Sequence, residues 1–229
     1  MTPKTILVLS IGTVAMLITM LPMSKRYQIA GWKTALSALL LTITGTIGTY
    51  IWFVVENGYF AGRSFYGAVF LVPPVFFLLA KFLRVHAGEL IDLCAPAECV
   101  MLTIMKYQCM KDGCCGGRVL CTTAEGLEVI FPSQIAETVA ALMIAVILIV
   151  MARNPKNRGT LFPWYMVIYG ASRFVLNLFR AEEAVFLLGM TAGNFWSVLA
   201  VIIGAAWLYL HKKTSQKDCV QCELLQSDE

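Results

Sequence analysis

Seven apolar stretches of roughly membrane-spanning length divide this chain, and they restrict its fold more than any other feature. A helix needs about 20 predominantly apolar residues to cross the hydrocarbon core of a bilayer. Since 59% of the 229 residues are hydrophobic and only 14% are charged, a soluble domain is excluded. The sequence therefore predicts an all-α polytopic membrane helix bundle, with spans at residues 6–23, 34–55, 67–83, 91–105, 135–151, 161–178 and 192–210.

The fourth stretch, residues 91–105, is the least regular because it is short and contains Asp92, Pro96 and Glu98. Charged side chains are costly at membrane depth, and an internal proline removes a helical hydrogen bond. We therefore expect a broken or tilted helix in this part of the chain.

The distribution of basic residues predicts how the chain is oriented in the membrane. If the N-terminus is outside, most of the eighteen Lys and Arg residues fall in inner loops, as the positive-inside rule requires. The chain then has a transmembrane domain at 1–211, whose first stretch is retained rather than cleaved, and a short polar cytoplasmic tail at 212–229. Because the basic residues flank the spans and form no stripe, nucleic acid is not an expected partner.

A polar segment, K-Y-Q-C-M-K-D-G-C-C-G-G-R at residues 106–118, separates the fourth and fifth stretches. It places cysteines, glycines and charged groups at the edge of the bilayer. Irregular backbone at membrane depth is tolerated only where it lines a cavity or is buried in protein, and polar groups there usually have a function. We expect a loop here, on the same outer face as residues 63–66, with the functional site beside it.

Five other motifs follow in order: R-S-F-Y-G-A at 63–68, A-P at 95–96, F-P-S-Q-I-A-E at 131–137, Y-G-A-S-R-F-V-L-N-L-F-R at 169–180 and T-A-G-N-F-W-S at 191–197. Together with residues 106–118, their order and spacing resemble the prolipoprotein diacylglyceryl transferase family. The resemblance implies seven spans, with the N-terminus outside, in a bacterial cytoplasmic membrane. It also implies transfer of a diacylglyceryl group from phosphatidylglycerol to the thiol of a lipobox cysteine in a preprotein signal peptide. Glycerol phosphate leaves, and the resemblance implies neither a cofactor nor a metal.

The resemblance implies roles for individual residues of this chain. Lys106 falls where the family has the arginine of its G-R-x-G-N signature, and Arg173 matches the arginine of Y-G-x-x-R-F. The implied catalytic residues are Tyr66, Lys106 and Arg173. The implied substrate-binding residues are Gly67, Cys109, Cys114, Gly117, Gln134, Glu137, Tyr169, Asn177, Arg180 and Asn194.

Several of these positions depart from the residues of well-known family members. Tyr66 stands where those members have a histidine, Cys109 replaces an asparagine, and Cys114 replaces a glutamate. Asn177 replaces another glutamate, and Asn194 replaces a glutamine. A divergent branch of the family has G-C-C in its signature and a tyrosine before the glycine, and this chain resembles that branch.

The same residues also have plainer interpretations. Arg173 lies well inside an apolar stretch and needs a counter-charge, which we expect a lipid phosphate to supply. Lys106 and Arg180 lie near span ends, where cationic side chains also serve as interfacial anchors. Glu137 begins a stretch, where an acid also stabilises a helix N-terminus. Tyr66 also suits an interfacial aromatic belt.

The cysteines leave further functions open. Cys109, Cys114, Cys115 and Cys121 cluster on the expected outer face, where they either line the site or form disulfides whose pairing the sequence does not determine. A membrane thiol oxidoreductase that uses this cluster is one alternative to the transferase. A non-catalytic lipid-binding relative is the other, because several positions of the family site are substituted.

Overall fold

The computed structural model describes residues 3–60, 62–113, 116–124, 126–181 and 185–227. Within these ranges the chain forms seven α-helices and two small antiparallel hairpins. The helices are α1 (Pro3–Arg26), α2 (Gly31–Asn57), α3 (Tyr66–Leu83), α4 (Ala87–Asp112), α5 (Ser133–Met151), α6 (Leu161–Asn177) and α7 (Ala192–Ser227). The strands are β1 (Val119–Thr122), β2 (Glu128–Ile130), β3 (Val185–Leu187) and β4 (Met190–Thr191), and a 3-10 turn (Pro155–Asn157) precedes α6.

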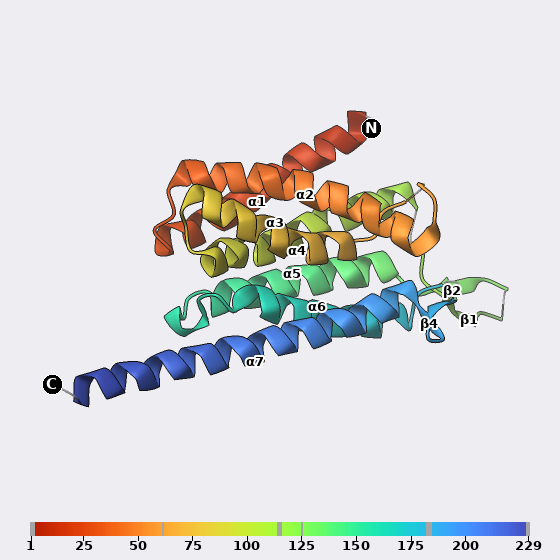
Figure 1. Cartoon of the computed structure of the whole chain (residues 1–229). Helices are drawn as coiled ribbons and strands as arrows, with labels where there is room; N and C mark the ends of the chain where they lie inside the picture. The colour runs from red at the N-terminus through yellow and green to blue at the C-terminus, as the bar shows by residue number, and fades with distance from the viewer. Residues whose placement is uncertain (1–2, 61, 114–115, 125, 182–184, 228–229) are drawn as a thin grey trace.

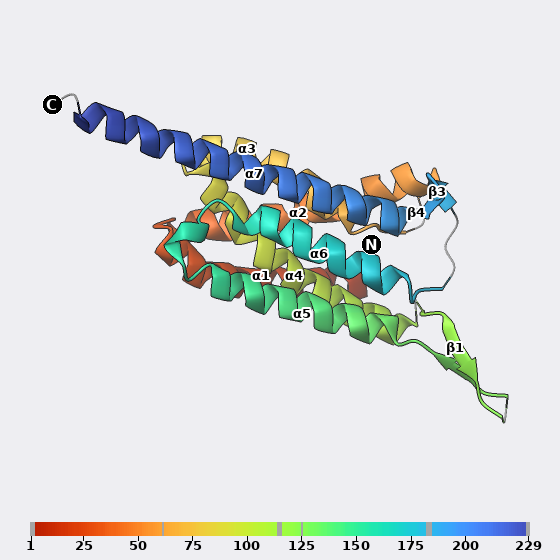
Figure 2. The ribbon, with the colours of Figure 1, turned by 90° about the horizontal axis from the view of Figure 1, so that it is seen from below.

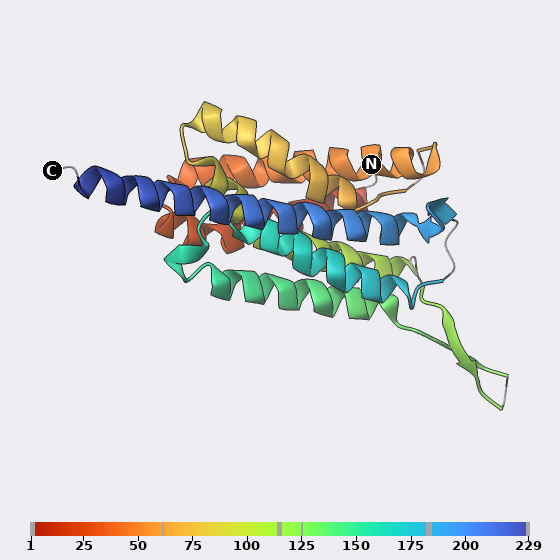
Figure 3. The same ribbon diagram turned by 60° about the horizontal axis from the view of Figure 1, so that its bottom comes forward.

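The helices lie side by side along one long axis, and both hairpins lie at one end of the bundle, here called the hairpin end (Figure 1). The β1–β2 hairpin projects away from the bundle at that end (Figures 2 and 3). Helix α1 begins at the hairpin end, whereas α7 ends at the opposite end, beyond the other helices (Figure 1). The predicted seven crossings require such an arrangement of the two termini. Which end is cytoplasmic stays a prediction.

The helices confirm the expected all-α membrane bundle. Within the described ranges, five helices are long and apolar enough to cross a membrane, namely α1, α2, α3, α5 and the part of α7 up to Thr214. Helix α6 has only 17 residues, and α4 carries six charged residues among its 26. These two helices carry five of the candidate site residues, namely Lys106, Cys109, Tyr169, Arg173 and Asn177.

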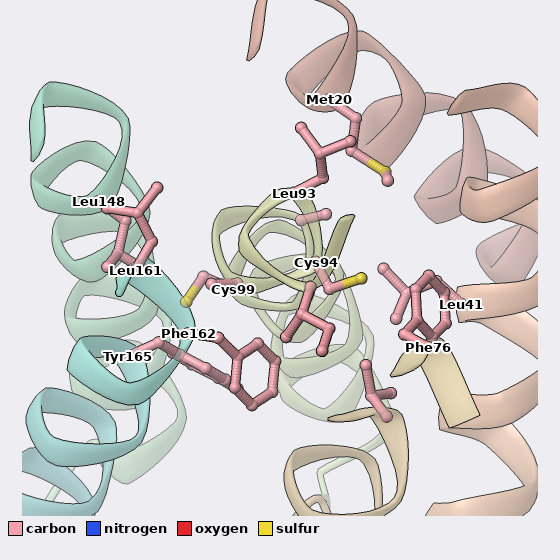
Figure 4. Packing of buried hydrophobic residues seen from close by; sticks show 14 of the residues in the cluster. Met20, Leu41, Phe76, Leu93, Cys94, Cys99, Leu148, Leu161, Phe162 and Tyr165 are labelled. Carbon is pink, nitrogen blue, oxygen red and sulfur yellow. The ribbon is translucent and has the colours of Figure 1, made fainter. Parts of the chain in front are cut away.

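Helix α4 lies at the centre of the bundle, where it contacts α1, α3, α5 and α6. In Figure 4, Cys94 points from α4 toward Leu41 and Phe76, whereas Cys99 points toward Leu161 and Tyr165. All of these side chains are buried. The charged residues in the middle of α4, Asp92 and Glu98, are buried in protein, which makes a polar helix compatible with a membrane bundle. Lys111 and Asp112 at its end are exposed.

The expected break in the fourth span is absent, because α4 is one α-helix from Ala87 to Asp112 with Pro96 inside it. The helix also continues through the first part of the segment that we expected to be a loop. It ends at Gly113, whose φ of 66° lies in the left-handed region that glycine adopts without strain. Lys106 and Cys109 thus lie on the last turns of a helix.

One of the charged residues in α4, Asp92, has a structural role. Its carboxylate accepts backbone N–H groups from Gly159, Leu161 and Phe162 at distances of 2.6, 2.9 and 3.2 Å. These donors belong to the first turn of α6 and the residues before it, where N–H groups have no partner within the helix. A carboxylate also complements the positive end of the helix dipole. Asp92 therefore fixes the start of α6 against α4.

Candidate functional site

Three cationic side chains converge on one buried carboxylate, that of Glu137, in the second turn of α5. The Lys106 ammonium pairs with Oε2 of Glu137. The Arg173 guanidinium pairs with Oε1, and Arg180 donates a hydrogen bond to the same oxygen at 3.0 Å. The Glu137 side chain is 4% exposed, and each cation is 13–15% exposed. We call these four side chains the Glu137 cluster.

Arg180 lies beyond the end of α6, but backbone contacts at the hairpin end hold it in place. Its peptide forms an isolated bridge with Gly117, and the neighbouring Arg118 N–H donates to the Phe179 carbonyl at 3.0 Å. A Cβ on Gly117 would lie 2.0 Å from the Phe131 carbonyl oxygen, so only glycine fits there without a shift. The base of the β1–β2 hairpin thus positions one cation of the cluster.

Among the residues that the structure describes, Lys106 and Arg173 share the single carboxylate of Glu137. This leaves one positive charge of these three side chains unbalanced in a largely buried place, and a buried excess charge is costly unless a counter-ion binds. A cavity adjoins the cluster and is lined by Glu137, Tyr169, Ser172 and Arg173 together with apolar residues of α4, α5 and α6. The site is therefore suited to an anion with several oxygen acceptors, such as a phosphate.

Arg173 has a counter-charge within the protein that we did not expect, the Glu137 carboxylate. The lipid phosphate that we expected beside Arg173 stays a prediction. Motif spacing alone did not reveal this contact, because Glu137 and Arg173 lie on different helices. The anchor interpretation of Lys106 and Arg180 also differs from what is observed, since both side chains point to a carboxylate within the protein.

Tyr66 and Tyr169 form an aromatic layer beside the cluster. Tyr169 lies one turn before Arg173 on α6, and its ring centroid is 5.7 Å from that of Tyr66. The Tyr66 hydroxyl lies 2.5 Å from Oγ of Ser197, which itself donates to the Gly193 carbonyl at 2.6 Å. Since a serine hydroxyl has one proton, Tyr66 is the donor in this pair. Tyr66 is buried, so it is not an interfacial belt residue.

Two carboxamides lie where the last turn of α6 meets the first turn of α7. Within the described ranges, neither Nδ2 nor Oδ1 of Asn177 has a hydrogen-bond partner, although both atoms are buried. The Asn177 amide packs against Gly193, where a Cβ would lie 2.3 Å from its Nδ2. Asn194 follows directly, and its buried Oδ1 also lacks a partner among the described residues. Asn177 shares a helix face with Arg173, so its amide lies one turn from a cation of the cluster.

The remaining predicted site residues lie near the cluster along their helices or in a contact between helices. Gln134 lies one turn before Glu137 on α5, and half-buried Cys109 lies one turn after Lys106 on α4. Gly67 belongs to a helix contact, because its added Cβ would lie 1.9 Å from the Gly48 carbonyl oxygen. Cys114 lies outside the described residues.

Sequence reasoning missed several polar residues. Ser197 was not singled out, although the motif at 191–197 contains it, and the role of Asp92 depends on a tertiary contact. Cys94 and Cys99 are buried free thiols, and Cys121 is an exposed one on β1. Among the described residues, no group of three or more His, Cys, Asp or Glu side chains is arranged to hold a metal ion.

Comparisons with known proteins give matches over most of the chain. The sequence profile described as prolipoprotein diacylglyceryl transferase matches residues 7–210. A protein of Dehalococcoides mccartyi strain 195, named phosphatidylglycerol–prolipoprotein diacylglyceryl transferase, is 20% identical over 93% of this chain and 90% of its own length. A protein of the same name from Clostridium tetani is 24% identical over 62% of this chain, and the alignment spans only 61% of that relative. One from Geobacter sulfurreducens is 30% identical over 58% of this chain and 54% of its own length.

Proposed function

Because this chain belongs to the prolipoprotein diacylglyceryl transferase family, we propose that it moves a diacylglyceryl group from phosphatidylglycerol to a cysteine thiol of a prolipoprotein. It is a multi-pass membrane protein, and we place it in the cytoplasmic membrane of a bacterium with its N-terminus outside. The observation that supports this activity best is that Lys106 and Arg173 converge on one buried carboxylate beside a cavity. Nothing in the matches supports the thiol-oxidoreductase alternative.

The Glu137 cluster suits the phosphate of phosphatidylglycerol. Lys106 and Arg173 present ammonium and guanidinium groups beside a cavity at membrane depth, and Arg180 adds a third cation. Fixed cations aimed at the place where negative charge develops lower the barrier for a leaving phosphate. Glu137 pairs with all three cations and holds them in position, so it is a positioning residue in this scheme.

The reaction replaces one bond of the lipid. The acceptor sulfur attacks the glycerol carbon that carries the phosphodiester, a C–S bond forms, and the C–O bond to phosphate breaks. The electron pair stays on the phosphate oxygen, and the thiol proton ends on the departing glycerol phosphate or on water. The attacking thiol comes from the acceptor, so no cysteine of this chain is the nucleophile. Cys109 and Cys114 instead belong to the segment beside the site.

The other residues hold the substrate or the cluster. Tyr66 donates its proton to Ser197, so in this arrangement it supports Tyr169 and Arg173 rather than accepting the thiol proton. Asn177, one turn from Arg173, and Asn194 have buried hydrogen-bonding atoms with no partner among the described residues, and we assign both to the lipid headgroup. The further headgroup and interface residues in this proposal are Gly67, Gly117 and Gln134.

Transfer to a synthetic peptide tests the proposal directly. Purified protein in vesicles that contain phosphatidylglycerol is incubated with a peptide that has an apolar segment followed by cysteine, and mass spectrometry detects the added diacylglyceryl group. Arg173→Ala is expected to lower the rate by about 100-fold or more, as removal of a donor to a developing charge does elsewhere. Arg173→Lys recovers little, because a point charge does not replace the planar fork.

The controls separate the possible outcomes. Arg153→Ala removes an exposed cation far along the chain from the cluster and should leave the rate unchanged. Vesicles of phosphatidylethanolamine alone should give no product. Full activity in Arg173→Ala would refute the assignment of the site. A wild-type protein that binds phosphatidylglycerol but never transfers it would instead be the non-catalytic lipid-binding relative.

A further inference from the structure

A second cavity adjoins α4 on the side where this helix packs against α1 and α2, away from the cavity beside the Glu137 cluster. Its volume is about 30 Å³. One water molecule needs about 10–15 Å³, so there is room for about two of them and not for a lipid chain or a peptide. Most of the walls are apolar and include Met16 and Met101, but Glu98 lines the cavity too. We call it the Glu98 cavity.

Glu98 is the unusual member of this lining. It is only 3% exposed, and neither of its carboxylate oxygens has a hydrogen-bond partner within the described parts of the chain. The Tyr165 hydroxyl on α6 interacts with Glu98 but lies outside hydrogen-bonding geometry. Burying a polar group without a partner is costly, and nearly all such groups in proteins bond to protein or to ordered water. The Glu98 oxygens therefore need donors from within the cavity.

The other polar residues of the lining suit water molecules. Thr46 and Thr49 line the wall on α2, and the Thr49 hydroxyl donates to the Thr46 carbonyl at 2.8 Å, so its oxygen can still accept. Arg63, in the loop before α3, also lines the cavity, and its guanidinium donates to the Tyr50 hydroxyl at 2.8 Å. A buried water molecule makes about three hydrogen bonds. Carboxylate, hydroxyl and guanidinium groups around one small cavity provide them.

A metal cation fits this cavity less well than water does. Arg63 is a fixed positive charge in the lining, and it repels a second cation. A hard cation also takes six or more oxygen ligands, whereas most of this lining is apolar. Water molecules both donate to Glu98 and accept from Arg63, so they connect two opposite charges whose side chains do not pair directly in the described structure.

We infer that the Glu98 cavity is a hydration site, in which about two bound water molecules donate hydrogen bonds to Glu98 and connect it to Arg63. Phe65 lines the same cavity, and its ring centroid is 5.4 Å from that of Tyr169 in the aromatic layer. The bound water therefore fills the space between α4 and the loop that carries the motif at 63–68, and it joins the two. This inference does not depend on the proposed transferase function.

Radiolytic footprinting of the purified protein tests the inference. X-rays split water into hydroxyl radicals, and radicals from bound water convert an adjacent methionine to its sulfoxide, which mass spectrometry detects. Met16 lines the cavity, whereas Met20 lies one turn farther along α1 and outside it, although the two are 1% and 0% exposed. Met16 should be oxidised at least about fivefold faster than Met20, after correction for an unirradiated sample. Equal rates for the two methionines would overturn the inference.

Substitutions of Glu98 show whether this residue holds the water. Glu98→Leu removes both acceptors, and since apolar cavities stay dry, Met16 oxidation should fall to the rate of Met20. Glu98→Gln keeps a hydrogen-bonding side chain and should retain at least about half of the wild-type rate. Glu89→Leu, the same change on the same helix outside the cavity, should leave the rate unchanged.

Two results for these variants decide the role of Glu98. Unchanged Met16 oxidation in Glu98→Leu would overturn the inference, because other groups would then hold the water. A loss of Met16 oxidation in Glu89→Leu as well would also overturn it, since the effect would not be specific to the cavity. If Glu98→Leu does not fold, the comparison of Met16 with Met20 in the wild type and in Glu98→Gln still decides the question.

Discussion

The substitution Asp92→Ala should destabilise the protein strongly, because one carboxylate satisfies three buried backbone donors. An orphaned buried donor costs about 1–3 kcal/mol, so three such groups cost at least about 3 kcal/mol. The melting temperature of a chain of 150–250 residues falls by about 2–4 °C per kcal/mol. The expected decrease is therefore at least roughly 6 °C.

Two further variants make this prediction specific. Asp92→Asn keeps the oxygen that accepts from Leu161 and Phe162 but loses the bond from Gly159, so about a third of the effect should appear. Glu89→Ala removes only a partly exposed ion pair with Arg158 and should change stability by at most about 1 kcal/mol.

Intrinsic fluorescence during heating in detergent measures these stabilities, since the chain has five tryptophans. A melting temperature of Asp92→Ala within about 2 °C of the wild type would refute the reasoning. That result would mean that the start of α6 is held by other contacts and that its N–H groups find new acceptors.

Two other predictions concern the hairpin end and the orientation. Gly117→Ala should lower transfer by at least about tenfold, because the new Cβ pushes the bridge to Arg180 apart and a small misplacement is costly in catalysis. Gly116→Ala is its control, since a Cβ there meets nothing within 4 Å, and equal activity of the two variants would contradict the role of the bridge. A reporter fused after Glu229 should be active in the cytoplasm, and a signal from the opposite side of the membrane would reverse the proposed orientation.

The number and type of the helices could be predicted from the sequence, because hydrophobic length is a local property. The course of α4 was harder to predict. Asp92 and Glu98 made that span seem discontinuous, but Asp92 is used by the first turn of α6 and Glu98 lines a cavity. Composition does not reveal whether a polar residue faces lipid or protein. The prediction that a loop begins at Lys106 was also wrong, since α4 ends only at Gly113.

All four members of the Glu137 cluster were singled out from the sequence, but their contacts with one another were not predicted. Motif order identified Lys106, Glu137, Arg173 and Arg180, and the family match confirms the resemblance that suggested them. That three cations share one carboxylate follows only from how α4, α5 and α6 pack. The assigned roles of these residues, and the outside location of the N-terminus, remain predictions.

The composition of the Glu137 cluster has a consequence for how the chain enters the membrane. Synthesis delivers Lys106 and Glu137 before Arg173 and Arg180, so an inserted intermediate of the first five helices contains one cation and one anion that neutralise each other. Neither has to cross the bilayer with its charge unopposed. The unbalanced positive charge beside this pair arises only when α6 joins and brings Arg173. A chain that has not yet inserted α6 therefore holds a neutral Lys106–Glu137 pair, and the site gains its excess cation last.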